Sequence, residues 1–193
     1  MNTSFGTIRQ LGFVVPDVHA AMRHWIDGPG AGPFYFIENA DVTDNTFRGR
    51  PSECPRVSIA LGQHGPVQIE LIQQHCERPS AYRPFIEAVG EGLHHVAYWT
   101  EQYDELLATA LSRGYVEIQA GRSGRGGPDD RFSYLESGAH HGSMIEVSEM
   151  GREKQALFDA IARASVDWDG AEPVRDVADL RAQLDRLNNG GAR

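Results

Sequence analysis

The stretch that decides the fold is IRQLGFVVPDVHAAMRHW, residues 8–25. Its first half is an apolar run rich in β-branched residues, which predicts a β-strand over residues 8–15. Pro16 and Asp17 follow as a turn and a helix N-cap. The apolar residues after them recur at helical spacing, at Val18, Ala21, Met22 and Trp25. A strand and then an amphipathic helix are therefore expected near the start of the chain.

The same pattern returns 85 residues later as LHHVAYWTEQYDELLATAL, residues 93–111. Residues 93–99 form the second apolar run, Thr100 takes the N-cap position, and a second apolar helix face follows. The two segments align without a gap, so that Gln10 falls on His95 and Gly12 on Ala97. A repeat of this kind constrains the architecture before any motif is interpreted.

Three shorter strand-like runs follow each predicted helix. They are residues 33–37, 56–61 and 67–73 in the first half, and residues 115–120, 131–135 and 144–148 in the second. Each half is thus a β-α-β-β-β module, the first over about residues 8–75 and the second over about residues 92–149. The closing strands carry Ile69-Glu70-Leu71 and Ile145-Glu146-Val147, offset by 76 rather than 85 residues. The difference of nine residues predicts a longer polar loop in the first module, within residues 41–55.

Residues 151–193 differ from the repeats in character. Apolar residues at helical spacing predict two amphipathic helices, around residues 156–161 and 177–187, joined by a connector at residues 168–173. We expect these helices to pack against the domain or a partner subunit rather than to take part in catalysis. The predicted fold is α+β, with two tandem modules in residues 1–150 forming a cupped mixed sheet, followed by a helical extension.

Composition excludes several functional classes. The chain has 193 residues, 18 basic and 27 acidic, and a formal net charge of −9, which argues against nucleic-acid binding. Cys54 and Cys76 are too few for a disulfide framework or a paired-cysteine zinc site. Because no apolar run is long enough to cross a membrane and the N-terminus lacks the features of a signal peptide, we expect a cytoplasmic protein with no membrane partner.

Coordinating side chains occupy matching positions in the two modules. Alternate residues of a strand share one face. The opening strands contribute Gln10 and His95, and the closing strands contribute Glu70 and Glu146, each Glu between aliphatic residues. A single Gln or Glu on a strand usually faces solvent, but a carboxylate buried among aliphatic residues is costly unless something neutralises it. The joint pattern predicts one divalent cation held by Gln10, Glu70, His95 and Glu146, with room for water or substrate. The alternative histidine is His94, which strand alternation places on the opposite face.

These motifs resemble the vicinal oxygen chelate superfamily, which includes glyoxalase I, methylmalonyl-CoA epimerase, extradiol dioxygenases and bleomycin-resistance proteins. The resemblance rests on Gln10-Leu-Gly-Phe-Val-Val-Pro-Asp, Gly92-Leu-His-His-Val-Ala and the two Ile-Glu-aliphatic strands, and it covers about residues 8–149. The Gly-Leu-His-His segment is most similar to the epimerases. The ordered set Gln, Glu, His, Glu is that of eukaryotic-type glyoxalase I, so Gln10 and Glu70 depart from the epimerase pattern.

The resemblance implies a metal-dependent lyase or isomerase that transfers a proton next to a metal-chelated carbonyl group. The metal would be Zn, Ni, Co or Mn, the site would lie within one chain or across a homodimer, and the substrate would carry vicinal oxygens or a thioester. It also implies that Glu146 is the first candidate for the base, with Glu70 serving the opposite face of the substrate. Substrate contacts are expected at Trp99, Arg131 and Tyr134, and at Arg122 and Arg125 in a Gly-rich loop.

Two other functions stay open at this stage. An extradiol dioxygenase needs two His ligands and one carboxylate, and Gln10 in place of the first His counts against it. A metal-free binding or resistance protein would use the cup to hold a ligand. Loss of ligand residues would mark that class, and here all four positions carry coordinating side chains.

Overall fold

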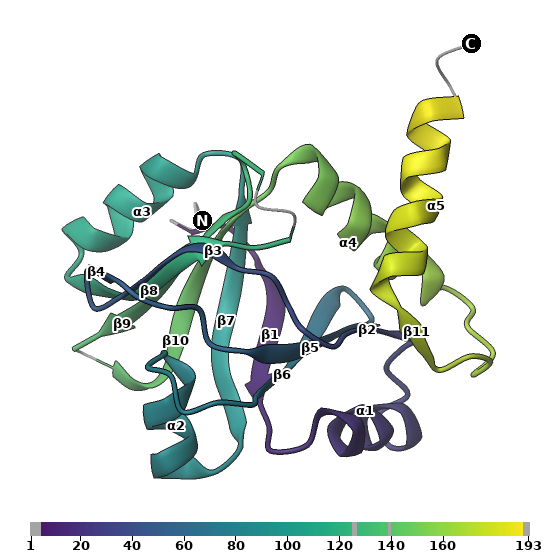
Figure 1. Cartoon of the computed structure of the whole chain (residues 1–193), viewed down its shortest axis with the longest axis horizontal. Coiled ribbons are helices and arrows are strands. Elements are labelled where there is room, and N and C mark those ends of the chain that lie inside the picture. The colour runs from purple at the N-terminus through teal and green to yellow at the C-terminus, as the bar shows by residue number, and fades with distance from the viewer. Residues whose placement is uncertain (1–4, 125–126, 139, 191–193) are drawn as a thin grey trace.

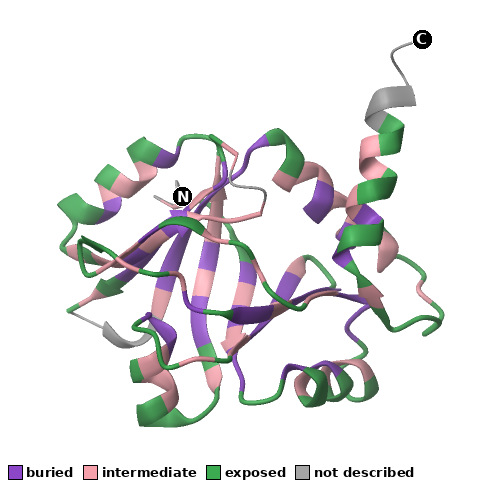
Figure 2. Cartoon of the chain, viewed as in Figure 1, coloured by how far each residue is buried: buried purple, intermediate pink, exposed green. Residues whose placement is uncertain are grey.

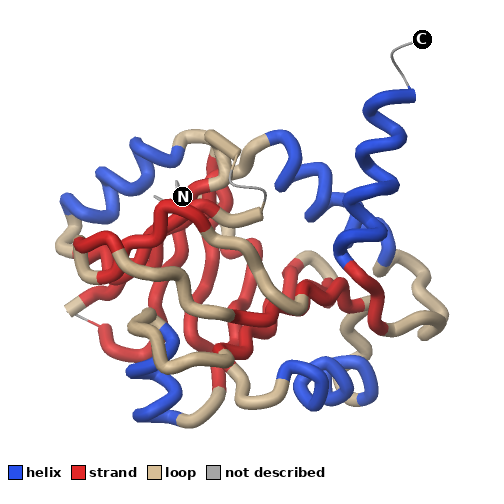
Figure 3. The backbone as a smooth tube through the Cα atoms, in the orientation of Figure 1, coloured by secondary structure: helices blue, strands red, loops and turns tan. Residues whose placement is uncertain are grey.

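One continuous sheet organises the chain, as seen in the computed structural model, which describes residues 5–124, 127–138 and 140–190. Side chains are described for these residues except 140–143 and 188–190. The sheet has eleven strands in the order β11-β2-β5-β6-β1-β7-β10-β9-β8-β3-β4. Figures 1 and 3 show its strands at the centre of the molecule and the helices around them.

Each predicted module is present as a block of four neighbouring strands with one helix. The first contains β1 (Ile8–Val14), α1 (Val18–Asp27), β2 (Phe34–Ile37), β5 (Val57–His64) and β6 (Val67–Gln74). The second contains β7 (Gly92–Thr100), α3 (Tyr103–Ser112), β8 (Tyr115–Arg122), β9 (Arg131–Ser137) and β10 (His140–Glu149). The opening strands β1 and β7 pair antiparallel, so they join the two modules at the middle of the sheet. The predicted α+β fold with two β-α-β-β-β modules is confirmed.

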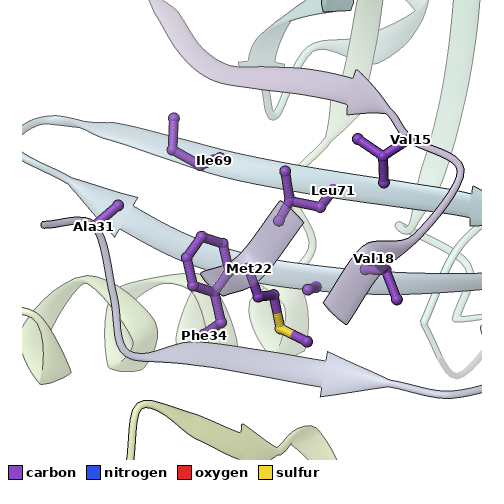
Figure 4. Packing of buried hydrophobic residues seen from close by; sticks show 8 residues of the cluster. Val15, Val18, Met22, Ala31, Phe34, Ile69 and Leu71 are labelled. Carbon is purple, nitrogen blue, oxygen red and sulfur yellow. The ribbon is translucent and has the colours of Figure 1, made fainter. Parts of the chain in front are cut away.

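The module helices cover the outer face of the sheet. In the first module α1 packs over β5 and β6, and Figure 4 shows Met22, Phe34 and Leu71 gathered in this cluster. In the second module α3 contributes Tyr103 and Ala110 to a cluster with Ile145 and Val147. Figure 2 shows buried residues concentrated on the central strands. Because Leu71 and Val147 are buried under helices, alternation turns their neighbours Glu70 and Glu146 to the inner face.

The polar segment at residues 41–55 is more ordered than the sequence predicts. It holds two short strands, β3 (Thr43–Phe47) and β4 (Arg50–Pro51), and β3 pairs with β8 of the second module. The side chain of Gln119 on β8 donates a hydrogen bond to Asn45 on β3 (3.0 Å), and Asn45 in turn donates to the Ser52 carbonyl (3.2 Å). The inserted segment of the first module therefore extends the sheet beyond β8, the outermost strand of the second module. A further helix that the sequence analysis did not predict, α2 (Tyr82–Val89), leads into β7.

The C-terminal extension forms the expected helices α4 (Arg152–Ala164) and α5 (Val177–Gly190), together with the unexpected strand β11 (Val174–Asp176). Strand β11 pairs parallel with β2 and extends the sheet of the first module. Leu157, Phe158 and Ile161 of α4 and Leu180 of α5 pack with Leu61 in one buried cluster. None of the helices in the described residues is long and apolar enough to span a bilayer.

Candidate metal centre

The four predicted metal ligands lie on the inner face of the central strands. Gln10 pairs with Gln68 of β6 on one side and Ala97 of β7 on the other. Two residues along, Gly12 pairs with Glu70 and His95 in the same way. Glu146 of β10 pairs with Ala97. The strand registers thus place the four side chains in two adjacent rows on one face of the sheet.

Three of these side chains meet around one point. The Nε2 atom of His95 lies 3.1 Å from Glu146 Oε2 and 3.3 Å from Glu70 Oε2. One ligand atom from each residue can be chosen so that all three lie within 4.8 Å of one another. His95 is fully buried and the two carboxylates are nearly so. All three residues come from a single chain.

The polar atoms at this point fit a bound cation. Glu70 Oε2 and His95 Nε2 are buried without a hydrogen-bond partner of acceptable geometry among the described residues. Leaving such atoms unsatisfied is costly. Carboxylate oxygen and imidazole nitrogen are donors that divalent transition metals accept. The donor set and its unsatisfied atoms therefore both suit a divalent metal ion.

Small residues create the space for this cluster. A Cβ atom on Gly12 would lie 1.9 Å from His95 Cε1 and 2.2 Å from His95 Nε2, so only glycine is compatible with the observed imidazole position. By the repeat, the equivalent residue of β7 is Ala97, which is fully buried opposite Gln10. Each coordinating residue of an opening strand therefore faces a small residue of the other module.

His94 contacts His95 rather than lying apart from it. A register shift between Gly12 and Phe13 interrupts the regular pairing of β1 with β7 at this position. The two Nδ1 atoms are 3.2 Å apart, and His94 Nε2 lies 3.2 Å from the Ala81 carbonyl oxygen. If His94 donates from Nε2 to that carbonyl, its Nδ1 accepts from His95 and directs the Nε2 lone pair of His95 toward the carboxylates. In that arrangement His94 orients the His95 ring.

The titratable groups of the cluster have opposite pKa shifts. Burial raises the pKa of Glu70 above its usual value. Burial also opposes ionisation of Glu146, but His95 and the more distant Lys154 outweigh it and lower the pKa of Glu146. Burial lowers the pKa of His95, but the Glu146 and Glu70 carboxylates outweigh burial and raise this pKa to about 9. The pKa of His94 falls to about 3 through burial and the neighbouring His95. The two carboxylates are thus chemically distinct.

Gln10 lies in the same cavity as Glu70 and Glu146. Its side chain is buried, and its Nε2 donates a hydrogen bond to Gln68 Oε1 (2.7 Å). The amide oxygen is then the polar atom of Gln10 that is left to serve a cation. Its place as fourth ligand stays a prediction.

Gln10, Glu70 and Glu146 line a cavity with an empty volume of about 1360 Å³, part of it open to solvent. Apolar side chains from three regions form its walls. They are Val42 from the inserted segment, Ile37, Val57, Ile59, Leu61, Phe132 and Tyr134 from the sheet, and Leu157, Phe158 and Leu184 from the C-terminal helices. A mostly apolar cavity with a few converging polar groups is the usual form of a small-molecule site.

The residues predicted to contact substrate have different surroundings. Tyr134 lines the cavity, its ring centroid lies 4.8 Å from that of His95, and its hydroxyl lies 3.0 Å from that of Tyr82. Trp99 packs against Phe158 of α4 with a centroid separation of 4.8 Å. Both belong to the inner face of the sheet.

The predicted arginines are held elsewhere. Arg131 forms ion pairs with Asp104 (2.8 Å) and Glu149 (2.7 Å) beside α3, and so lies on the outer side of β9. Arg122 binds Asp44 of the inserted segment (3.0 Å). Neither is among the described residues that line the cavity. These contacts give both arginines structural roles, and Arg125 lies outside the described residues.

Tyr82, Gln119 and Lys154 are among the polar cavity residues that the sequence analysis missed. Lys154 precedes Leu157, Phe158 and Ile161 at helical spacing, so a charged residue on an apolar helix face was the available signal. Gln119 accepts a hydrogen bond from the Ala81 amide (2.7 Å) as well as contacting Asn45. Sequence alone gives no sign of that long-range contact.

Comparison with known proteins relates this architecture to one family. A sequence profile described as the Glyoxalase/Bleomycin resistance protein/Dioxygenase superfamily matches residues 9–134. The match includes Gln10, Glu70 and His95, and it ends before Glu146 and the C-terminal extension. The uncharacterized protein YqjC of Bacillus subtilis (strain 168) is 29% identical over 94 residues. That alignment covers 49% of this chain and 66% of YqjC, just under two thirds of the relative's length.

Solved structures share the fold at low sequence identity. Hypothetical protein BH1468 from Bacillus halodurans C-125 superposes with a TM-score of 0.56 at 20% identity, covering 76% of this chain and 95% of that one. Methylmalonyl-CoA epimerase from Mycobacterium tuberculosis gives a TM-score of 0.55 at 19% identity, covering 81% and 96%. These similarities concern the fold of the chain.

Substituting Gly12 by Ala should disrupt the cluster, because the added methyl group would overlap the His95 ring. We expect a loss of about 1–3 kcal/mol in the free energy of unfolding, measured by urea denaturation, and weaker zinc binding by calorimetry. Gly138→Ala is the matched control, since a Cβ there would meet nothing within 4 Å. Equal stability and zinc affinity in the two variants would contradict the proposed constraint.

The metal-free protein should lose stability as pH rises from about 6.5 to about 9. The pKa of His95 is about 9 in the folded chain and about 6.5 when unfolded, so its stabilising contribution is complete below the lower value and lost above the higher one. Zinc binding should strengthen over the same range, because the metal must displace this proton. Urea denaturation at several pH values tests this, with His95→Gln as the comparison. The same pH profile in both proteins would exclude His95 as the source.

Proposed function

Because this chain belongs to the glyoxalase/bleomycin resistance protein/dioxygenase superfamily, we propose that it is a divalent-metal-dependent enzyme that transfers a proton next to a carbonyl group. The reaction would be that of a glyoxalase I-like lyase or a methylmalonyl-CoA epimerase-like isomerase. The single observation that carries this proposal is the buried Glu70, His95 and Glu146 cluster, whose donor atoms converge and whose two carboxylates line a mostly apolar cavity. The substrate would be a small molecule with vicinal oxygens or a thioester.

We assign the metal to Glu70, His95 and Glu146, with the amide oxygen of Gln10 as fourth ligand. Zinc, nickel, cobalt or manganese would suit this mixed oxygen and nitrogen set. When bound, the ion would stabilise negative charge that develops on a substrate oxygen. The chain supplies the remaining elements: His94 holds the His95 ring, and Gly12 and Ala97 leave room above the strands.

The two carboxylates of the cluster would share the proton transfer. Glu146 is the first candidate for the base that accepts the proton from substrate carbon. Glu70 would serve the opposite face of the substrate. One carboxylate on each side of the substrate would serve an isomerase, and a proton returned to a neighbouring carbon would serve a lyase.

The alternative functions have less support. An extradiol dioxygenase requires two His ligands, whereas His94 is turned to His95 and the Ala81 carbonyl. A metal-free binding protein remains the second candidate, because the large apolar cavity would suit ligand storage as well as catalysis. A homodimer stays a prediction, and the three clustered residues do not require one, since they come from one chain.

The purified protein should contain about one divalent ion per chain, and it should regain activity when zinc, nickel, cobalt or manganese is restored after chelation. Elemental analysis measures the metal, and exchange of substrate α-protons with deuterated solvent measures activity on acyl-CoA thioesters and hemithioacetals. His95→Ala should lose the metal because the imidazole lies between both carboxylates. His64→Ala, an exposed position outside the cavity, is the control. A protein that binds none of these metals would be assigned to the binding class.

Replacing Glu146 by Gln should abolish α-proton exchange while most of the fold is preserved, because the amide keeps the shape of the side chain but is not a base. Proton NMR in deuterated buffer follows the exchange, and circular dichroism checks the fold. Glu136→Gln is the control, since Glu136 is an exposed residue on the adjacent strand β9. Continued exchange in the Glu146 variant would remove this residue from the mechanism.

A further inference from the structure

Lys154 carries a positive charge from the C-terminal helix α4 into the cavity. It is the only lysine in the chain; every other basic residue among the 18 is arginine. Its Nζ donates hydrogen bonds to Ser148 Oγ (2.9 Å) and to the Glu149 carbonyl oxygen (3.1 Å). Helix α4 thus fixes an ammonium group beside β10.

The hydrogen-bond partners of this ammonium in the described residues are both uncharged. An ammonium has three N–H donors, so these two hydrogen bonds leave one donor for a ligand. Burial lowers the pKa of Lys154, while Glu146, Asp130 and Glu70 act on it in the opposite direction through space. A largely desolvated cation with one donor left favours a close anionic partner.

The position of Lys154 relates it to the candidate metal centre. Ser148 lies two residues beyond Glu146 on the same face of β10 and lines the same cavity. Two residues of a strand span about 7 Å. With a divalent ion bound, the Glu70 and Glu146 carboxylates would be neutralised, and of the acidic groups that act on Lys154 only Asp130 and Glu149 would keep their charge. The free N–H of the ammonium would then be better able to bind an anionic group of the substrate.

Apolar side chains form much of the wall of the cavity that Lys154 lines, although charged residues such as Asp130 and Arg181 line it too. Helices α4 and α5 contribute Leu157, Phe158 and Leu184 to its wall, and Ile59 and Leu61 of β5 also line it. A ligand placed there would remove apolar surface from water along most of its length. The site therefore combines a charged anchor with a wall suited to hydrocarbon or an aromatic ring.

We propose that Lys154 binds a carboxylate of the substrate, which is an organic acid whose apolar body lies between the sheet and helices α4 and α5. This inference rests on the proposed function, because it places the substrate of that same site. It makes Lys154 a specificity-determining residue that comes from outside the segment matching the family. The C-terminal extension would thus select the substrate, and the repeated modules would carry out the chemistry.

The test compares binding of 4-phenylbutanoate with that of its neutral amide, 4-phenylbutanamide, by calorimetry on the full chain. The zinc-loaded protein is the deciding sample, because the ion then neutralises Glu70 and Glu146, and the drop from wild type to Lys154→Gln isolates the lysine since the metal is present in both. The wild type should prefer the acid, and Lys154→Gln should reduce that preference by about tenfold, the effect of one charged hydrogen bond. Lys154→Arg should retain much of it. Arg163→Gln, at an exposed position of the same helix, should leave it unchanged.

A second measurement uses the wild-type protein and therefore does not require a variant to fold. Reductive ¹³C-methylation labels Lys154, the one lysine, together with the N-terminal amine, and keeps both charges. A pH titration separates the two methyl resonances because the α-amine has the lower pKa, and the Lys154 resonance should shift with 4-phenylbutanoate and not with the amide. Absence of an acid preference in the wild type, an unchanged preference in Lys154→Gln, or equal shifts with both probes would overturn the inference. Zinc uptake on the same samples tests the metal centre separately, so either proposal can fail alone.

Discussion

The antiparallel pairing of β1 with β7 is the constraint on which the rest of the structure depends. It sets Gly12 opposite His95 and Ala97 opposite Gln10, so each coordinating side chain has a small residue across from it. The neighbouring strands β6 and β10 then add Glu70 and Glu146 to the same face. A shift of one residue in this pairing would turn His95 away from both carboxylates.

Burial of charge follows from this geometry. The His95 imidazole lies 3.3 Å from a Glu70 oxygen and 3.1 Å from a Glu146 oxygen in a buried site, where unpaired charges are costly. A proton on His95 would reduce that cost in the metal-free cluster, and the two carboxylates accordingly raise the pKa of His95. A divalent cation would neutralise the two carboxylates with its greater charge. The same donor atoms therefore suit both the protonated and the metal-bound cluster.

The repeated modules and the segments outside the repeat form different parts of the cavity. The repeated modules place donors at the cavity floor, while the inserted segment at residues 41–55 and the C-terminal helices form walls. Strand β11 of the extension pairs with β2. The hydrogen bond from Gln119 to Asn45 holds the inserted segment against β8. Segments outside the common pattern are therefore the ones that shape the space for a ligand, which is where a family with one fold can acquire different substrates.

The sequence by itself determined the two modules and the four inward-facing side chains, because strand alternation and an 85-residue repeat are local patterns that survive in the fold. The contact between His94 and His95, the outward position of Arg131 and the inward position of Lys154 were decided only in the tertiary structure. An irregular strand register, an ion pair with Asp104 on α3 and the docking of α4 produce these three results. Each of these three causes brings together segments that lie far apart in the sequence. The periodicity of the sequence therefore could not reveal them.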